Sequence, residues 1–162
     1  MLLPSAVDLA EEARTAITDA LTEAREAEVT VDAQLNAAPV WGDSSLLGQL
    51  VGNLVTNAVR HNRPNGSVHI ATRTAGEGGA FVEVANTGPD VRESDLPTLC
   101  EPFQRGSGRR KGAGLGLSVV RAVTATHQGK MIIRVNPSGG LTVRVEFPAA
   151  HAAGPGHGAG DP

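Results

Sequence analysis

The sequence has few aromatic residues and almost no cysteine. Its 162 residues include one tryptophan, three phenylalanines, no tyrosine and one cysteine. Surfaces that stack nucleic-acid bases are built from aromatic side chains, so we expect no such surface here. The single cysteine, Cys100, excludes an internal disulfide and a zinc site made of several cysteines.

Net positive charge and long apolar runs are missing as well. The formal net charge is -3, which gives no overall field for attracting nucleic acid or an anionic membrane. No apolar run approaches the roughly 20 residues that cross a bilayer, and the N-terminal segment does not resemble a signal peptide. We therefore expect no nucleic-acid partner, no direct membrane contact from this segment and a cytoplasmic location, whether or not the parent protein is membrane-anchored. One basic cluster indicates a small anionic ligand: Arg105, Arg109, Arg110 and Lys111.

The periodicity of apolar residues predicts one domain of mixed α and β structure. Helices are expected over 8–28, 44–62 and 114–128, and strands over 29–35, 67–74, 80–86, 130–135 and 141–147. We expect 39–43 to be a connector whose Trp41 covers the core, and 87–114 to be a long functional loop. The inward stripe of the third helix is predicted to be Leu115, Val119, Ala122, Val123 and Thr126. This order indicates an α+β fold, a two-layer α/β sandwich with helices on one face of a mixed sheet.

The predicted helix 44–62 carries an unusual polar stripe. Its apolar residues fall on one arc, and the opposite side is expected to hold Asn53, Asn57, Arg60 and His61. Solvated helix faces are usually rich in lysine and glutamate, whereas asparagine is a poor helix former. An amide oxygen is a suitable Mg²⁺ ligand, and arginine pairs with phosphate. The stripe therefore indicates a site for a magnesium-bound nucleotide.

A glycine-rich segment precedes the third predicted helix. Residues 111–118 read KGAGLGLS, and their backbone amides at a helix N-terminus are suited to phosphate. The spacing matches neither the dinucleotide fingerprint nor the P-loop. We interpret the segment as a phosphate-binding loop of another class, the alternative being a plain surface loop. A second turn, NTGPD at 86–90, places Asn86 at a strand end, where it can meet a base edge.

Four segments in order resemble the motifs of the GHKL ATPase superfamily, and within it those of sensor histidine kinases. They are NLVTNAVRHN (53–62), NTGPDV (86–91), EPFQRG (101–106) and GAGLGLSVV (112–120), and the ending GGLTVRVEFP (139–148) is also similar. The resemblance implies the Bergerat ATP-binding fold, with ATP and Mg²⁺ held under a flexible lid. It covers residues 8–148, so that 1–7 would be the exit from a dimerisation hairpin and 149–162 a disordered tail.

The resemblance also implies roles for individual residues. Asn57 would bind Mg²⁺, with Asn53 and Arg60 near the phosphates and His61 near the nucleotide. Asn86 would accept a hydrogen bond from the adenine amino group in a turn shaped by Gly88. The lid and the phosphate loop would be formed by Phe103, Arg105, Gly112, Gly114, Leu115, Gly116 and Leu117.

Two positions depart from the family pattern. The family usually has aspartate where this chain has Asn86, and glycine where it has Asp90. An amide oxygen still accepts a hydrogen bond from an amine, without the negative charge of a carboxylate. We therefore expect nucleotide binding to survive the change.

An acceptor histidine is not recognisable in this sequence. None of the five histidines is followed by an acidic residue: His61, His69, His127, His151 and His157. The resemblance therefore implies that the γ-phosphate is passed to a histidine on a separate dimerisation domain, and from there to a response regulator. Two alternatives stay open, namely a free-standing GHKL serine kinase of the anti-sigma-factor type and a nucleotide-sensing module without kinase activity.

Overall fold

The computed structural model describes residues 4–99 and 113–149, with the side chains of 98, 99 and 113–116 left undescribed. Its helices are α1 (Leu9–Glu26), α2 (Ser44–Arg60), the short α3 (Leu96–Leu99) and α4 (Ala113–Thr126). Its strands are β1 (Ser5–Asp8), β2 (Thr30–Leu35), β3 (Pro39–Gly42), β4 (Ser67–Thr74), β5 (Ala80–Asn86), β6 (Lys130–Val135) and β7 (Leu141–Phe147). Short 3-10 turns lie at Gly76–Gly78 and Glu93–Asp95.

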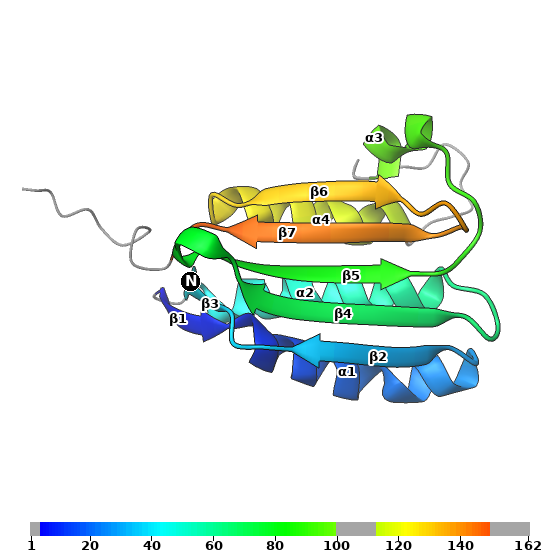
Figure 1. Ribbon diagram of the computed structural model, residues 1–162, viewed down its shortest axis with the longest axis horizontal. Coiled ribbons are helices and arrows are strands. Elements are labelled where there is room, and N and C mark those ends of the chain that lie inside the picture. The colour runs from blue at the N-terminus through cyan, green and yellow to red at the C-terminus, as the bar shows by residue number, and fades with distance from the viewer. Residues whose placement is uncertain (1–3, 100–112, 150–162) are drawn as a thin grey trace, which may run out of the picture.

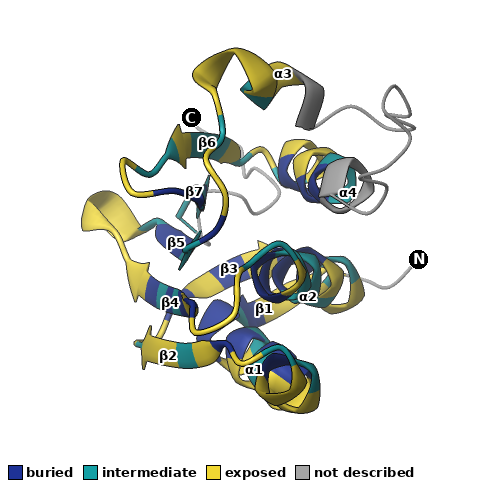
Figure 2. Ribbon diagram, turned by 90° about the vertical axis from the view of Figure 1, so that its right-hand side faces the viewer, coloured by how far each residue is buried: buried dark blue, intermediate teal, exposed yellow. Residues whose placement is uncertain are grey.

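Five strands form a mixed sheet in the order β2-β4-β5-β7-β6. The β2–β4 pair is parallel and the other three pairs are antiparallel. Helices α1, α2 and α4 cover the same face of this sheet, and the buried side chains lie between the two layers (Figures 1 and 2). The predicted two-layer α+β sandwich is confirmed.

The core lies between α2, the central helix, and the middle strands. α2 buries Leu47, Leu50, Val51, Leu54, Val55, Ala58 and Val59, and contacts both α1 and α4. The inward side chains of β4 and β5 meet this face at alternating positions, with Val68, Ile70, Val82 and Val84 all buried. Fully burying an aliphatic side chain of this size contributes about 1.5–3 kcal/mol, so this layer contact dominates the stability of the domain.

Two expectations about connecting segments were wrong. Residues Pro39–Gly42 are not a simple connector, because they form β3 and pair antiparallel with β1 in a separate two-stranded sheet. In that sheet Trp41 faces outward and keeps 38% of its surface exposed, so it does not cover the core. The predicted loop 87–114 also contains structure, since α3 and the turn before it fall inside its first half.

The inward face of α4 also differs from the prediction. Its described buried residues are Leu117, Val120, Val123 and Thr124, whereas Ala122 and Thr126 are exposed. The predicted stripe did not include Thr124. In the structure, however, its hydroxyl donates to the Val120 carbonyl oxygen at 2.6 Å and can be buried without leaving a free donor.

His127 joins the end of α4 to the start of α2. Its Nδ1 lies 2.9 Å from the Val123 carbonyl oxygen, and its Nε2 lies 3.1 Å from the Asp43 backbone nitrogen. One ring nitrogen thus faces a carbonyl acceptor and the other a backbone N–H donor. Asp43 is in turn the N-cap of α2, so this ring fixes α4 relative to the helix that carries the asparagines.

None of the described helices covers the opposite face of the sheet (Figure 1), and charged side chains cover Phe81 there. Phe81 points to this face and is only 4% exposed. The Arg144 guanidinium lies 3.7 Å from the centre of its ring, and the Arg73 guanidinium lies 5.6 Å away. Arg144 also pairs with Glu146 at 2.8 Å. Cation–π contacts with these two guanidinium groups thus cover the Phe81 ring on this face of the sheet.

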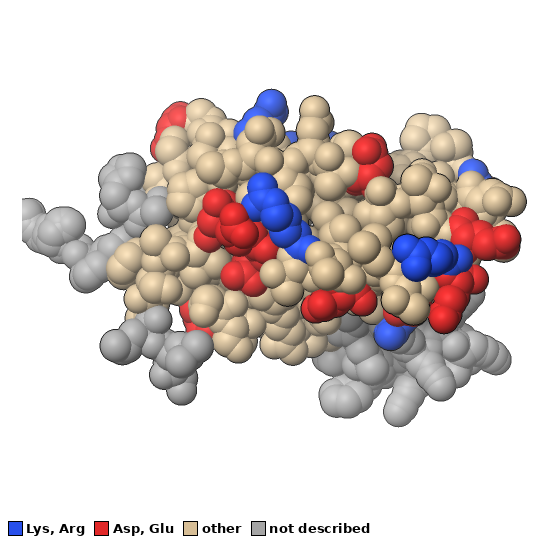
Figure 3. Space-filling view, turned by 90° about the horizontal axis from the view of Figure 1, so that it is seen from below, with Lys and Arg blue, Asp and Glu red and all other residues tan. Residues whose placement is uncertain are grey.

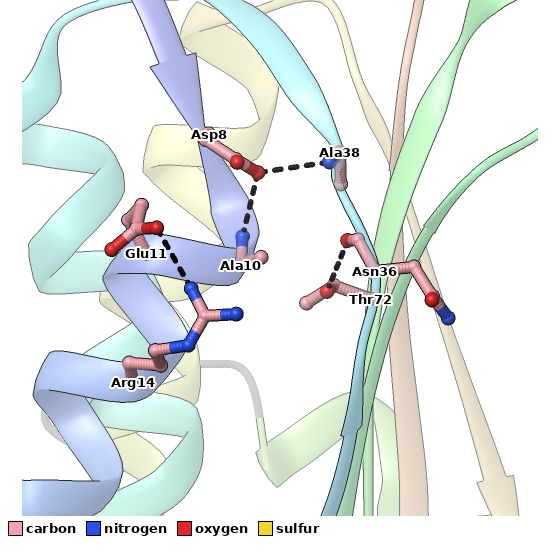
Figure 4. A network of polar contacts seen from close by, with 7 residues as sticks. All are labelled: Asp8, Ala10, Glu11, Arg14, Asn36, Ala38 and Thr72. Atoms are coloured by element: carbon pink, nitrogen blue, oxygen red, sulfur yellow. Dashed lines mark hydrogen bonds and ion pairs between the residues drawn. The ribbon is translucent and has the colours of Figure 1, made fainter.

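The Asp8 carboxylate organises the entrance to α1 (Figure 4). It accepts hydrogen bonds from the Ala10 nitrogen at 3.0 Å, as the helix N-cap, and from the Ala38 nitrogen at 2.8 Å. Ala38 is fully buried, so its amide has no access to water as an alternative partner. Asp8 therefore both starts the helix and holds the segment that leads into β3.

We predict that Asp8→Ala lowers the free energy of unfolding by about 2–3 kcal/mol, because the variant loses a cap and leaves the Ala38 amide buried without a partner. Asp43→Ala is the matched control. Its carboxylate accepts only from Ser45 and Leu46 at the start of α2, so about 1 kcal/mol is expected. Urea unfolding measures both. Equal losses in the two variants would show that the Ala38 contact contributes nothing.

The exposed side of α1 is rich in acidic residues (Figure 3). One of them, Glu12, is partly buried, and its carboxylate packs against Gly48 of α2. A Cβ atom added at Gly48 would lie only 2.9 Å from Glu12 Oε1. Burial, and to a smaller extent the neighbouring Glu11, raise the pKa of the Glu12 carboxyl above its ordinary value.

Because this pKa is raised, folding binds a proton at Glu12, and stability falls as the pH rises through the folded-state pKa. We therefore predict that Glu12→Gln is more stable than the parent chain at pH 7, and that the advantage disappears near pH 4. Unfolding by urea at the two pH values provides the measurement. The control Asp19→Asn, on an exposed position of the same helix, should show no such gain. An equal gain in both variants would exclude burial of Glu12 as the cause.

Candidate functional site

The C-terminal ends of α2 and β5 meet beside a glycine turn. His61 is the C-cap of α2, and its backbone nitrogen donates to the Asn57 carbonyl oxygen at 2.9 Å. A Cβ on Gly88 would lie only 2.7 Å from the His61 carbonyl oxygen and 3.4 Å from Asn86 Nδ2. The predicted residues His61, Asn86 and Gly88 are thus brought together, with Asn57 one turn earlier on α2. Gly88 is required because a side chain would separate the two elements.

Asn57 lies on the flank of the buried face of α2, not on the opposite side as predicted. At 100° per residue it continues the line of Leu50 and Leu54, which are both buried. Its Nδ2 is buried and has no hydrogen-bond partner among the described residues. An unsatisfied buried donor of this kind costs about 1–3 kcal/mol, so in a native protein such a group is commonly paired with a bound ligand, an ion or ordered water.

The chemistry of Asn57 fits a nucleotide carrying Mg²⁺. The amide nitrogen donates and therefore suits a phosphate oxygen, while the amide oxygen is of the neutral, hard type that binds Mg²⁺. The described residues contain no cluster of three or more histidine, cysteine or acidic side chains that could hold a metal ion. Mg²⁺ that is bound together with a nucleotide usually takes much of its coordination from phosphate and water.

The turn after β5 is fastened from its far side by the turn between β6 and β7. Asn136 Nδ2 donates to the Asn86 carbonyl oxygen at 3.1 Å, and the Gly140 nitrogen donates to the Pro89 carbonyl oxygen at 3.0 Å. Gly139 and Gly140 have positive φ angles of 106° and 88°. Side chains there would also collide with the backbone of Gly88 and Asn86. Both glycines are needed for conformation and for close approach.

Asn53 and Arg60 flank Asn57 on α2, one turn before it and one turn after it. Arg60 Nε pairs with Glu23 Oε2 of α1 at 2.8 Å, and 60% of the Arg60 side chain is exposed. Asn53 is half-buried on the side of α2 away from the sheet. The structure therefore pairs Arg60 with α1, although its spacing of three residues from Asn57 places the two on the same side of the helix.

Most of the predicted phosphate loop cannot be compared with the structure. Phe103, Arg105 and Gly112 lie outside the described residues. Gly114, Leu115 and Gly116 lie in the first turn of α4, where only the backbone is described. Leu117 was predicted to bind the cofactor, but its side chain packs in the hydrophobic core and is 4% exposed. The role predicted for Leu117 stays a prediction, and its side chain shares the inward face of α4 with Val120 and Thr124.

Sequence reasoning missed the residues that support the site. Thr87 and Asn62 form a hydrogen bond of 2.6 Å between the turn and the end of α2, and Asn136 braces Asn86 from the last hairpin. The sequence offered one signal, since Asn62 and Thr87 are adjacent to predicted site residues. Nothing in the sequence indicates which side chain in the NPSGG turn reaches another loop.

The comparisons with known proteins agree with this architecture. The family model described as histidine kinase-, DNA gyrase B-, and HSP90-like ATPase matches residues 42–151. The sensor protein CutS of Streptomyces coelicolor is 42% identical over 147 residues, which are 88% of this chain and 35% of CutS. The signal transduction histidine-protein kinase BaeS of Escherichia coli is 35% identical over 115 residues, which are 67% of this chain and 24% of BaeS. The chain thus spans about a third or less of the length of these relatives.

Solved structures show the same fold. The catalytic domain of the histidine kinase ThkA, in a nucleotide-free form, superimposes with a TM-score of 0.81 at 24% identity, covering 94% of this chain and 99% of that one. The mycobacterial sensor histidine kinase MprB gives a TM-score of 0.77 at 25% identity, covering 89% and 97%. The five-stranded mixed sheet with helices on one face is therefore that of a histidine kinase catalytic domain. The chain belongs to the histidine kinase-, DNA gyrase B- and HSP90-like ATPase family, and these relatives are sensor kinases.

Proposed function

We propose that this chain binds Mg²⁺-ATP as the catalytic domain of a two-component sensor histidine kinase. It would transfer the γ-phosphate to a histidine on a separate dimerisation domain of its parent protein, which then serves a response regulator. The observation that supports this most strongly is the buried, unpaired Asn57 Nδ2, on the flank of α2 that leads to the Gly88 turn. We place this domain in the cytoplasm. No helix in the described part of the chain is long and apolar enough to cross a membrane.

In this proposal each described residue has a limited task. Asn57 holds the phosphate end of the nucleotide through its amide, and Asn86 holds the base end at the close of β5. Gly88 keeps the space between them free of side chains. Mg²⁺, when bound, would neutralise phosphate charge. Phosphoryl transfer depends mainly on positioning and charge neutralisation, which this domain would provide. The nucleophile in this proposal is the acceptor histidine of the dimerisation domain.

The proposal predicts opposite effects of Asn57→Ala on stability and on binding. Without nucleotide the variant should be as stable as the parent chain or more stable, because it removes a buried donor that has no partner. Its affinity for Mg²⁺-ATP should fall about 10–100-fold, because a hydrogen bond to a charged group contributes about 1.5–3 kcal/mol. Calorimetric titration with and without Mg²⁺, together with urea unfolding, measures both effects.

Thr56→Ala is the matched control for this experiment, since Thr56 is the neighbouring half-buried residue on α2. It should leave ATP affinity unchanged. Unchanged affinity in Asn57→Ala, or metal-independent binding in the parent chain, would contradict the proposed site.

We also predict that this chain alone forms no phosphoprotein with radiolabelled ATP and hydrolyses ATP only slowly. Labelling should require an added dimerisation domain that carries the acceptor histidine, and the label should be acid-labile, as a phosphoramidate is. Acid-stable label on a partner protein would instead support a serine kinase. Tight ATP binding with no acceptor under any condition would favour a nucleotide-sensing module.

A further inference from the structure

The pairing of β5 with β7 ends one residue before β5 itself does. The last pair in that ladder joins Ala85 to Thr142, whereas on its other side β5 still pairs with β4 through Asn86 and Val68. The backbone of Asn86 therefore has a strand partner on one side only. The turn between β6 and β7 lies at this same end of the sheet (Figure 1).

A side chain from that turn takes the place of the absent strand partner. Asn136 Nδ2 donates to the Asn86 carbonyl oxygen at 3.1 Å, between residues 50 positions apart in the sequence. A carbonyl oxygen only accepts hydrogen bonds, so the NH₂ group of Asn136 must face it. At the other end of the same amide, Asn136 Oδ1 accepts from the Thr142 hydroxyl at 2.7 Å. Linked hydrogen bonds of this kind strengthen one another.

The backbone of Asn136 is fixed by its own turn. Its nitrogen donates to the Gly140 carbonyl oxygen, and its carbonyl oxygen accepts from the Gly139 nitrogen, both at 3.0 Å. The Gly140 nitrogen also donates to the Pro89 carbonyl oxygen at 3.0 Å, so the turn meets the end of β5 at a second point. Among the described hydrogen bonds between the two turns, the Asn136 bond is made by a side chain. Substitution can therefore remove it without altering the backbone.

We propose that Asn136 is a positioning residue for nucleotide binding, which acts by holding Asn86 at the end of β5 and does not itself contact the nucleotide. This inference rests on the proposed function, in which Asn86 and Asn57 hold the two ends of the ligand. Asn57 belongs to α2 and Asn86 to the sheet, so their alignment depends on contacts that fix the end of β5. Loss of the Asn136 bond lets that end move relative to α2, and nucleotide affinity falls.

The test uses Asn136→Asp, which keeps the size of the side chain and its acceptor for Thr142 but replaces the NH₂ group by oxygen. Two acceptors then face each other at the Asn86 carbonyl. Calorimetry should show the affinity for Mg²⁺-ATP lowered at least about fivefold, the usual consequence of losing one net hydrogen bond. Asn136→Ala, which removes the amide altogether, should also lower it. The control Ser138→Ala, at an exposed position of the same turn, should keep the parent affinity.

A double-mutant cycle separates positioning from a general loss of structure. In an Asn86→Ala background, Asn136→Asp should change the affinity by less than about twofold, because the side chain that it positions is absent. In an Asn57→Ala background the full loss should persist, because Asn57 lies on another element. Urea unfolding shows that each variant is folded under the conditions of the titration. If Asn136→Asp does not fold, Asn136→Ala replaces it in both cycles.

The outcomes distinguish this inference from the proposed function. Parent-like affinity in the folded Asn136 variants would overturn the inference and leave the nucleotide site in place. An equal loss in the parent and Asn86→Ala backgrounds would overturn it as well, because the hairpin would then act on the domain as a whole. Failure of the parent chain to bind Mg²⁺-ATP would overturn the proposed function and this inference together.

Discussion

The site depends on one constraint, the close contact of three backbone segments around the turn that follows β5. The end of α2 and the Gly139–Gly140 turn both lie against Gly88. None of the three glycines tolerates a side chain without displacing a neighbouring segment. Because the contacts are between backbones, the relative positions of Asn57 and Asn86 are set by the fold and not by flexible side chains.

The one-sided arrangement of the helices explains how α2 can carry both core and site. Its apolar arc packs on the sheet, and the flank of that arc continues into Asn57 and His61. This position buries the Asn57 amide nitrogen without giving it a partner. The domain therefore accepts a local loss of stability at a group suited to a ligand, a pattern typical of functional sites. On the other face of the sheet, the Arg144 guanidinium lies over the Phe81 ring and covers it.

The sequence predicted most elements because their signals are local. Alternation identified β4 and β5 at the bounds that the structure has, and the Asp8 cap marked the start of α1. Alternation did not identify β3, because short strands have little sequence pattern of their own. That strand is defined by its pairing with β1, more than 30 residues earlier. The predicted inward face of α4 differed from the observed one at Thr124. Burial of this residue depends on a hydrogen bond to the helix backbone, which composition does not reveal.

Only part of the site could be predicted, because only some of its features leave a local signal in the sequence. Residue type and spacing identified Asn57, Asn86 and Gly88, whose chemistry is visible in the sequence. Arg60 was grouped with them by helical spacing, by its affinity for phosphate and by the family resemblance, and the structure pairs it with Glu23 on another helix. The contacts that orient the site, from Thr87, Asn62 and Asn136, join segments that are 20 to 50 residues apart. No local pattern encodes such contacts, so they required the folded chain.

The central claim is that the buried Asn57 amide is the docking point for the phosphate end of a magnesium nucleotide. The most direct measurement is the NMR signal of its side-chain NH₂ group in the ¹⁵N-labelled chain, assigned by its absence from the Asn57→Ala spectrum. Addition of a non-hydrolysable ATP analogue with Mg²⁺ should shift this signal together with the backbone signals of Asn86 and Gly88. An analogue that binds and shifts signals elsewhere, while the Asn57 side-chain signal stays in place, would contradict the account.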